Sequence, residues 1–483
     1  MLPLQGQLPL SNHLDLYDIV VPRDNMLRQI NDLIDFRFVH DELTNKYCLD
    51  NGRMAQSPVR MFKYLLLKVI FDISDVDVVE RSRYDMSFKY FLGMTPEEGV
   101  INPSSLTKFR HLRLKDMDLM NLLIGKTVEI AIQKELIKSK TIIVDATHTL
   151  SKTNPHSPLE FLKMRSKNLR KVIYQWDEKC KERLPAKNED NDLGHELEYI
   201  RKLIELIASD PVLPHVPIVK EKLSLLEEAL EDTADHYTVS SDPDARVGHK
   251  SEEDPFFGYK THIAMSDERI ITGVTVTSGE KGDGGELPEL IEQSRRNGME
   301  IKTVIGDTAY SGKDNLELTE KEKIALVSKL NPVISNGLRK EADKFDYNKD
   351  ADRMVCPAGH MAISKYKHKP KGNRNARYTY YFDTEKCKTC SLREGCYKEG
   401  TKSKTYSVII KAKEHQAQEA FEQTDRFRKL YRERYKIEAK NAELKNRHGY
   451  DRAWSIGLPS MQMQGAVTIF VVNIKRILTL MKD

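Results

Sequence analysis

Cysteine, tryptophan and long apolar runs are all scarce in this sequence. Only six cysteines and two tryptophans occur among 483 residues, so the chain is not a small secreted scaffold held together by disulfides. The most hydrophobic tract, residues 465–481, is interrupted by Asn473, Lys475 and Arg476. A membrane-spanning helix needs about 20 consecutive apolar residues. We therefore expect this tract to form a packed core helix and the protein to have no membrane association.

A signal peptide and a large net charge are also missing. The first 15 residues, MLPLQGQLPLSNHLD, have neither the basic start nor the long apolar stretch of a secretory signal, which predicts a cytoplasmic protein. The formal charge is only +4, but residues 361–483 contain 27 Lys+Arg against 13 Asp+Glu, which leaves −10 on the rest of the chain. A basic C-terminal quarter predicts a polyanionic partner.

Residues 431–445, YRERYKIEAKNAELK, contain neither Gly nor Pro and consist mostly of good helix formers. At about 100° per residue, a helix here would place a polar stripe within an arc of roughly 80°. The stripe consists of Tyr431, Arg434, Glu438, Asn441 and Lys445. A narrow apolar stripe directly beside it consists of Leu430, Ile437 and Leu444. This arrangement would hold Glu438 half-buried at the mouth of a cleft, although an ordinary charged surface helix fits the same pattern.

Two short apolar segments upstream each lead to an aspartate. Residues 141–145 (TIIVD) and 302–310 (KTVIGDTAY) predict buried strands that end at Asp145 and Asp307. Between them we expect adjacent antiparallel strands over 256–265 and 270–277, followed by a helix. Asp145 could instead simply cap the turn that follows its strand.

The helical stretch and the two strands together resemble a known family. The spacing Tyr-x2-Arg-x3-Glu-x6-Lys, present at Tyr431, Arg434, Glu438 and Lys445, is similar to the signature of bacterial insertion-sequence transposases of the DDE type. The resemblance implies an α/β fold, a ribonuclease H-like mixed sheet with flanking helices, in which the first and fourth strands are neighbours. The two aspartates and Glu438 would then meet as the catalytic residues.

The resemblance also implies a metal-dependent reaction on DNA. Asp145, Asp307 and Glu438 would bind two Mg²⁺ ions, or Mn²⁺ in their place, about 3.5–4 Å apart. The ions would support cleavage and transfer of DNA strands by in-line displacement at a phosphodiester. The Tyr, Arg and Lys of the signature would contact phosphates beside the scissile bond. Trp454 and the aromatic cluster 378–382 are candidates for stacking a flipped base, although core packing accounts for them as well.

We expect two domains, one of them interrupted twice. Residues 1–125 predict a helical, DNA-binding N-terminal domain, and residues 135–483 a ribonuclease H-like catalytic domain. Residues 155–236, rich in Lys, Glu, Leu and Arg, predict a helical insertion that forms an arm for DNA or for a second subunit. Residues 345–410 form the second insertion, which is small and rich in cysteine.

Within the N-terminal domain, Pro103 opens a predicted helix that runs towards Leu114. Its polar side chains include Lys108 and Arg110 and suit phosphate and base-edge contacts in a helix-turn-helix-like module. In the family that the chain resembles, a region placed like this one binds the inverted repeats. A helical bundle with a polar outer face is the alternative.

The cysteine-rich insertion predicts a structural metal site. Cys356, Cys387, Cys390 and Cys396 could give a zinc-ribbon-like site of four thiolates, with His360 as a substitute ligand. Free buried thiols are the alternative.

A basic segment with interleaved aromatics lies between these cysteines. Lys367 and Lys369 belong to a run in which lysines occupy every second position and would share one face of a strand. Such a run is typical of a surface that holds nucleic-acid phosphates, although a solvated loop would look the same.

These features predict a transposase that acts on double-stranded DNA, both the terminal inverted repeats and a target, as a homodimer. It would be cytoplasmic in a bacterium and associated with the nucleoid when bound to DNA. The alternatives are a transposase-derived DNA-binding protein without cleavage activity and a structure-specific nuclease that uses the same metals.

Overall fold

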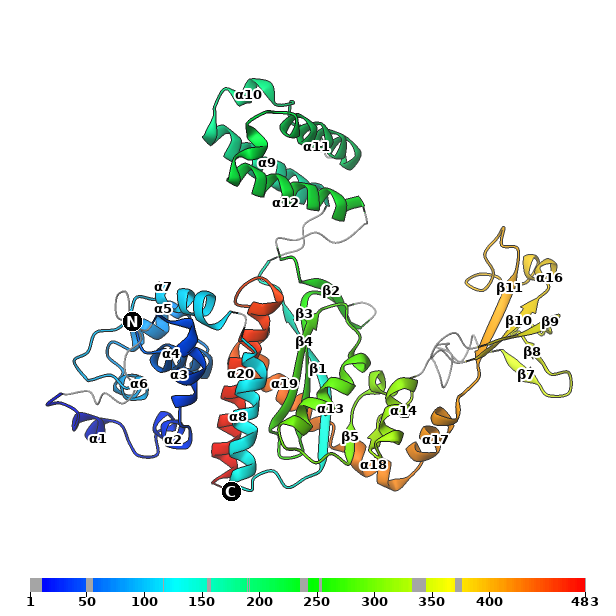
Figure 1. Ribbon diagram of the computed structural model, residues 1–483. Helices are drawn as coiled ribbons and strands as arrows, with labels where there is room; N and C mark the ends of the chain where they lie inside the picture. The colour runs from blue at the N-terminus through cyan, green and yellow to red at the C-terminus, as the bar shows by residue number, and fades with distance from the viewer. Residues whose placement is uncertain are drawn as a thin grey trace.

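The computed structural model describes residues 11–48, 55–115, 117–153, 158–188, 190, 192–234, 242–251, 254–331, 345–369 and 376–482. The protein is an α/β structure, about half of it helical, built around one mixed sheet (Figure 1).

In the described part of the chain, six strands form the central sheet. They are β1 (Thr141–Leu150), β2 (Arg246–Ser251), β3 (Asp254–Ser266), β4 (Ile271–Ser278), β5 (Thr303–Ile305) and β6 (Ala325–Val327). On one edge β1 pairs antiparallel with β3, and on the other it pairs parallel with β5, which pairs parallel with β6. The other edge of β3 pairs antiparallel with β2 over the first part of the strand and with β4 over the rest. The order β4–β3–β1–β5–β6 is consistent with a ribonuclease H-like core.

Helices cover both faces of the sheet. One face carries α8 (Leu119–Gln133), α19 (Tyr435–His448) and α20 (Leu458–Leu480), and the other carries α13 (Leu287–Arg296) and α14 (Lys313–Lys321). Side chains alternate between the faces along a strand. Ile143 accordingly packs into the core with α20, whereas Ile142 and Val144 pack into a separate core with α13. Asp145 has the parity of Ile143, which places it on the α19 side.

The N-terminal region is helical and packs directly against α20. It comprises α1 (Leu16–Val20), α2 (Met26–Leu33), α3 (Arg37–Leu43), η1 (Thr44–Lys46), α4 (Pro58–Phe71), α5 (Asp75–Arg81), α6 (Met86–Leu92), α7 (Ser104–Phe109) and η2 (Arg110–Leu114). The helix expected from Pro103 towards Leu114 is present, with η2 as a π-helical final turn. The rings of Phe62 and Phe470 lie 5.9 Å apart, so the apolar core runs without interruption from α4 into α20.

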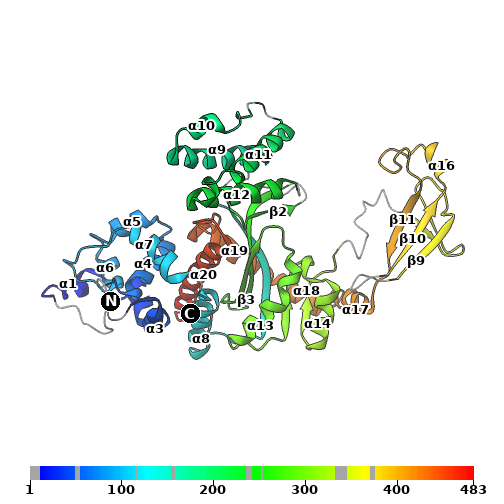
Figure 2. The same cartoon turned by 45° about the horizontal axis from the view of Figure 1, so that its top comes forward.

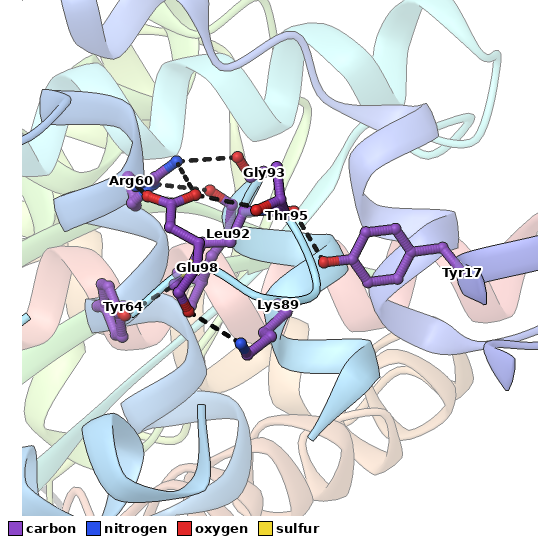
Figure 3. Close-up of polar contacts among 9 residues, drawn as sticks. Tyr17, Arg60, Tyr64, Lys89, Leu92, Gly93, Thr95 and Glu98 are labelled. Carbon is purple, nitrogen blue, oxygen red and sulfur yellow. Dashed lines mark hydrogen bonds and ion pairs between the residues drawn. The ribbon is translucent and has the colours of Figure 1, made fainter. Parts of the chain in front are cut away.

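Several cations of this region serve the fold itself. Arg60 donates hydrogen bonds to the carbonyls of Leu92 at 3.3 Å and Gly93 at 2.9 Å and also pairs with Glu98 (Figure 3). Lys89 is buried and donates to the carbonyl of Glu98 at 2.9 Å. Buried carbonyls need such partners, so these two side chains hold the loop after α6.

A helical unit stands apart from the sheet (Figure 1). It comprises α9 (Pro158–Trp176), α10 (Cys180–Arg183), α11 (Leu193–Ala208), η3 (Leu213–His215) and α12 (Pro217–Ala234). Leu162, Ile200 and Leu203 are fully buried within a core that contains no residue of the sheet. The unit therefore has an apolar centre of its own.

A second separate region lies beyond α17, on the far side of the molecule from the N-terminal helices (Figure 2). It comprises β7 (Asp346–Asn348), β8 (Arg353–Val355), β9 (Ser364–His368), β10 (Arg377–Phe382), α16 (Thr384–Lys388) and β11 (Lys404–Ile409). The chain returns to the sheet through α17 (Lys413–Glu422) and α18 (Asp425–Arg432). Phe345, Tyr380, Phe382 and Tyr406 form the core of this region.

Helix α20 confirms the packed core helix expected near the C-terminus. It is the one helix among the described residues that is long and apolar enough to cross a membrane, and 72% of its most apolar window is buried inside the protein. Asn473, which interrupts the apolar tract, is fully buried and exchanges two 2.8 Å hydrogen bonds with the backbone of Ile271. Its amide thus satisfies backbone groups at the start of β4.

Candidate active site

Asp145 and Asp307 come together because β1 and β5 are neighbouring parallel strands. The pairing sets Ile143 opposite Ile305, and each aspartate follows two residues later. Whereas β5 ends at Ile305, β1 continues to Leu150 along β3. Asp145 therefore lies within its strand, whereas the sequence predicted it at the strand's end. The strand is longer than predicted because β3 continues to pair with β1 beyond the end of β5.

Burial suppresses the charge of this pair. Burial raises the pKa of Asp145 from 3.8 to about 7; Arg434 opposes the rise, while Asp307 and Asp283 add to it. Burial also raises the pKa of Asp307, although the Ala309 N–H donates to its carboxylate at 3.0 Å and counteracts the rise. Carboxyl groups that resist ionisation mark a place where negative charge lacks compensation from the protein.

The Tyr-Arg-Glu-Lys stretch approaches this pair, but it does so as two helices. Helix α18 ends before Glu433, and Arg434 is the N-cap of α19. Phe427 is buried in the core, and its ring stacks on that of Tyr431 with the ring centroids 5.5 Å apart. Helix α18 therefore packs against the core through its own aromatic side chain. The single helix predicted over 431–445 is wrong, and Tyr431 shares no helix face with the residues of α19.

Glu438 lies at the edge of the site with its carboxylate held by Arg434. Glu438 Oε1 is 2.5 Å from Arg434 Nη2, and the Glu438 side chain is 55% exposed. One turn further along α19, Asn441 Nδ2 donates to Asp145 Oδ2 at 2.9 Å. The same Arg434 acts electrostatically on Asp145 and Asp307. Across the described part of the chain no three His, Cys, Asp or Glu side chains are arranged to hold a metal ion, which agrees with the pairing of Glu438 to Arg434.

Lys445, about two turns beyond Glu438 on α19, contacts His148 further along β1. Its Nζ lies 3.2 Å from both ring nitrogens of His148. Burial lowers the pKa of Lys445 to about 8 and that of His148 to about 4. Lys250 lowers both pKa values further, and Lys445 itself adds to the effect on His148. Two adjacent basic groups that resist protonation would be stabilised in their charged forms by an anion.

Two polar residues near the aspartates were missed by the sequence analysis. Asp283, the first residue of η4 (Asp283–Glu286), raises the pKa of both Asp145 and Asp307 and pairs with Lys260 at 2.9 Å. The Tyr310 hydroxyl is buried without a hydrogen-bond partner among the described residues, and burial raises its pKa well above the usual value, with the aspartates adding. The position of Asp283 shortly after a predicted strand was the available signal.

The N-terminal DNA-binding candidates differ in their exposure and in their contacts within the protein. Lys108 is exposed on α7. Arg110, by contrast, donates to Asp75 at 3.1 Å, and Lys68 pairs with the same carboxylate at 3.0 Å. The Lys68 ammonium also lies 5.1 Å from the centre of the Trp454 ring. Arg110 and Trp454 line one cleft of about 1030 Å³ between η2 and the start of α20.

The predicted lysines lie on the basic strand β9 and directly after it. Lys367 and Lys369 are exposed, and Lys367 lies 5.8 Å from the centre of the Tyr378 ring. Tyr380 and Phe382 are buried. For these two members of the cluster 378–382, core packing is therefore the correct interpretation and base stacking is excluded.

The four cysteines of the second insertion are neighbours without forming a metal site. Burial raises the pKa of Cys387, and the other three cysteines act on it electrostatically. The His360 N–H donates to Cys356 Sγ at 3.3 Å, and the Leu392 N–H donates to Cys390 Sγ at 3.4 Å. As for the acidic residues, no set of ligands able to hold an ion is formed by the cysteines that the structure describes.

Two family models match the chain at its two ends. Residues 15–112 match a family described as Transposase domain (DUF772), and residues 355–478 match one described as Transposase DDE domain. The second match includes Glu438, while both aspartates precede it. No curated protein matches the chain.

The chain is thus a transposase, and its domains imply DNA binding. The two matches support its assignment to the DDE transposases of insertion sequences, as the Tyr-Arg-Glu-Lys spacing predicted.

Proposed function

We propose that this transposase cleaves and joins DNA strands at the ends of an insertion sequence, with Asp145, Asp307 and Glu438 as its catalytic carboxylates. The observation that carries the proposal is a pair of half-buried carboxylates at neighbouring parallel strands, Asp145 within β1 and Asp307 two residues beyond the end of β5. Arg434 extends this pair to Glu438, because the one guanidinium contacts Glu438 and acts on both aspartates.

The residues present fit divalent metal ions such as Mg²⁺ or Mn²⁺. All three groups offer oxygen, the ligand that Mg²⁺ prefers. Asn441 Oδ1 is buried beside Asp145 without a partner among the described residues, so the site has acceptors in excess of donors. Asp145, Asp307 and Glu438 would hold the ions. When bound, two such ions activate the attacking hydroxyl and stabilise charge on the leaving 3′ oxygen of an in-line displacement.

The surrounding side chains would orient the carboxylates and the DNA. Asn441 fixes the rotation of the Asp145 carboxylate through its 2.9 Å hydrogen bond. Arg434 would exchange Glu438 for a DNA phosphate, since a guanidinium binds either anion by paired hydrogen bonds. A phosphate beside Lys445 would favour its charged form, because an anion offsets the effect of burial that lowers its pKa. Tyr431 would contact DNA from the end of α18.

The rest of the chain would bind and position DNA. We assign residues 1–125 to the binding of the inverted repeats, with Lys108 and the cleft at Arg110 and Trp454 facing the duplex. Lys367 and Lys369 would contact phosphates further along. The catalytic domain would span 135–483, as a ribonuclease H-like fold interrupted at 155–236 and 345–410.

The cysteine-rich insertion would bind structural zinc. Backbone N–H groups donate to the sulfurs of Cys356 and Cys390, and cysteine sulfur is a ligand of structural Zn²⁺. Cys387 and Cys396 would complete the set. Bound zinc would stabilise an insertion with only a small apolar core.

The function is tested with DNA that carries the inverted repeats flanking the gene. Wild type is expected to nick and join this DNA in Mg²⁺, with self-association on DNA visible by light scattering. Asp307→Asn should reduce cleavage by at least about 10²–10³-fold, the scale of losing one principal electrostatic group. Asp346→Asn, which alters an exposed strand carboxylate far from the site, is the matched control.

Each other outcome contradicts part of the proposal. If wild type and Asp307→Asn bind equally and neither cuts, the protein is a DNA-binding protein without cleavage activity. Cleavage without joining would identify a structure-specific nuclease. A bacterial cytoplasmic location, at the nucleoid when DNA is bound, is checked by fluorescence microscopy of a tagged chain.

A further inference from the structure

A second cleft lies on the other side of α19 from the acidic site. We call it the α19–α20 cleft; its volume is about 760 Å³, and α2, α19, Arg269 and the last turns of α20 line it. Its described lining includes six Lys or Arg side chains: Arg269, Lys440, Arg447, Lys475, Arg476 and Lys482. Only two carboxylates, Asp24 and Glu443, accompany them. The cleft thus carries a formal surplus of four positive charges.

Helix geometry separates this cleft from the catalytic candidates. At about 100° per residue, Lys440, Glu443 and Arg447 lie roughly 140–200° around α19 from Glu438. The buried Leu444 and Ile437 form the stripe between the two faces. One helix therefore presents an acidic site on one side and a basic wall on the other.

The positive charges of the cleft are only partly compensated by the protein. Lys440 is 3% exposed and has one ion-pair partner among the described residues, Glu443 at 2.8 Å. Its pKa is lowered by burial and then further by Arg476 and Arg269. Burial also lowers the pKa of Lys475. Burying cations next to one another is costly, so the cleft favours an anion.

His448 supplies an independent sign of a ligand. Its side chain is 1% exposed, and its Nδ1 lies 2.9 Å from the carbonyl of Val69. Because a carbonyl only accepts, Nδ1 carries the proton. The buried Nε2 has no partner among the described residues, and His448 is one of the residues that line the cleft. Burial lowers the pKa of this ring; a phosphate held beside it would favour the protonated ring, in which Nε2 donates a hydrogen bond.

We propose that the α19–α20 cleft binds phosphates of a duplex DNA backbone at a point separate from the scissile bond, so that α19 contacts DNA on both of its sides. Duplex DNA carries one negative charge per about 1.7 Å of its axis. Several adjacent phosphates therefore match a surplus of four charges better than one small anion does. The identity of the polyanion rests on the proposed function, whereas the phosphate chemistry follows from the cleft itself.

The test measures binding without cleavage. All proteins carry Asp307→Asn, and the variant adds Arg447→Gln, Lys475→Gln and Lys482→Gln, which are exposed or half-exposed positions. The control instead carries Lys302→Gln, Lys321→Gln and Lys323→Gln, the same change of charge before β5 and β6, at the strand ends away from Asp307. Affinity for inverted-repeat duplex is measured at several salt concentrations, and circular dichroism verifies folding.

We expect the cleft variant to bind more weakly and with a flatter salt dependence. Each lost phosphate contact reduces the slope of log K against log[salt] by about 0.9, so loss of all three reduces it by about 2.7. The control should match the parent. Equal slopes for the cleft variant and the control would overturn the proposal.

Two further results distinguish duplex DNA from a small anion as the occupant of the cleft, and the cleft from the catalytic site. If inorganic phosphate raises the melting temperature of the parent but not of the cleft variant, and DNA affinity is unchanged, the cleft holds a small anion and the DNA assignment is wrong. If the flatter slope is found but the protein with its native Asp307 never cuts DNA, the cleft assignment stands and the proposed function fails.

Discussion

Neutralising Asp145 should stabilise the metal-free protein while it abolishes DNA cleavage. Its folded-state pKa of about 7 lies above the ordinary value of 3.8, so the folded protein binds this proton more tightly than the unfolded chain does. The favourable contribution is complete below about pH 3.8 and is lost as the pH rises through 7. Asp145→Asn keeps the shape and the acceptor for Asn441 but removes the buried charge.

The size of the effect follows from the same pKa. Each pKa unit corresponds to about 1.4 kcal/mol, so ionised Asp145 costs up to about 4 kcal/mol at pH 8. At pH 5 the cost falls to about 1.6 kcal/mol. Because Asp307 shares part of the repulsion, we expect a gain of about 1–4 kcal/mol for Asp145→Asn at pH 8.

Urea unfolding in the presence of EDTA, at pH 8 and at pH 5, measures this gain. Asp346→Asn, on an exposed strand position, is the control and should change the free energy of unfolding by no more than about 0.5 kcal/mol. Added Mg²⁺ should stabilise wild type but have less effect on Asp145→Asn. A variant that is no more stable than wild type at pH 8, or whose advantage grows towards pH 5, would refute the claim of an uncompensated buried charge.

Three further predictions concern other parts of the molecule. Arg434→Gln should release the Glu438 carboxylate and reduce DNA cleavage by about 10–10²-fold while tightening Mn²⁺ binding measured by calorimetry; unchanged Mn²⁺ affinity would show that the ion pair does not compete with metal. Gly258→Ala should destabilise the sheet by about 1–3 kcal/mol or more, since the added Cβ would collide with the backbone oxygen of Thr149; thermal unfolding measures this, and an unaltered melting temperature would contradict the β1–β3 contact. Cys390→Ser should lower the zinc content found by mass spectrometry and increase proteolysis within 345–410, and a protein free of zinc from the outset would end that proposal.

Local sequence pattern was sufficient for the elements whose burial is periodic. The β-branched runs before Asp145 and Asp307 became β1 and β5 because such runs suit strands buried on both faces. The apolar 465–481 became α20, and Asn473 within it found its partners in β4. Each of these outcomes depends on a residue's own neighbours along the chain.

Tertiary packing decided what those patterns left open. Local helix propensity favours a continuous helix over 431–445, yet the chain forms two helices, and Phe427 of α18 and Ile437 of α19 are each buried in the core. The length of β1 depends on β3, which is more than a hundred residues away in sequence.

Sequence by itself thus indicated the family, the strands that lead to the aspartates and the helical structure around Glu438. Only the tertiary structure brought Asp283 near the two aspartates, paired Glu438 with Arg434 and buried Lys440 near other cations. The physical reason is that a residue's charge state and hydrogen bonds depend on what lies within a few ångströms of it, and in a folded chain those neighbours come from distant segments brought together by packing.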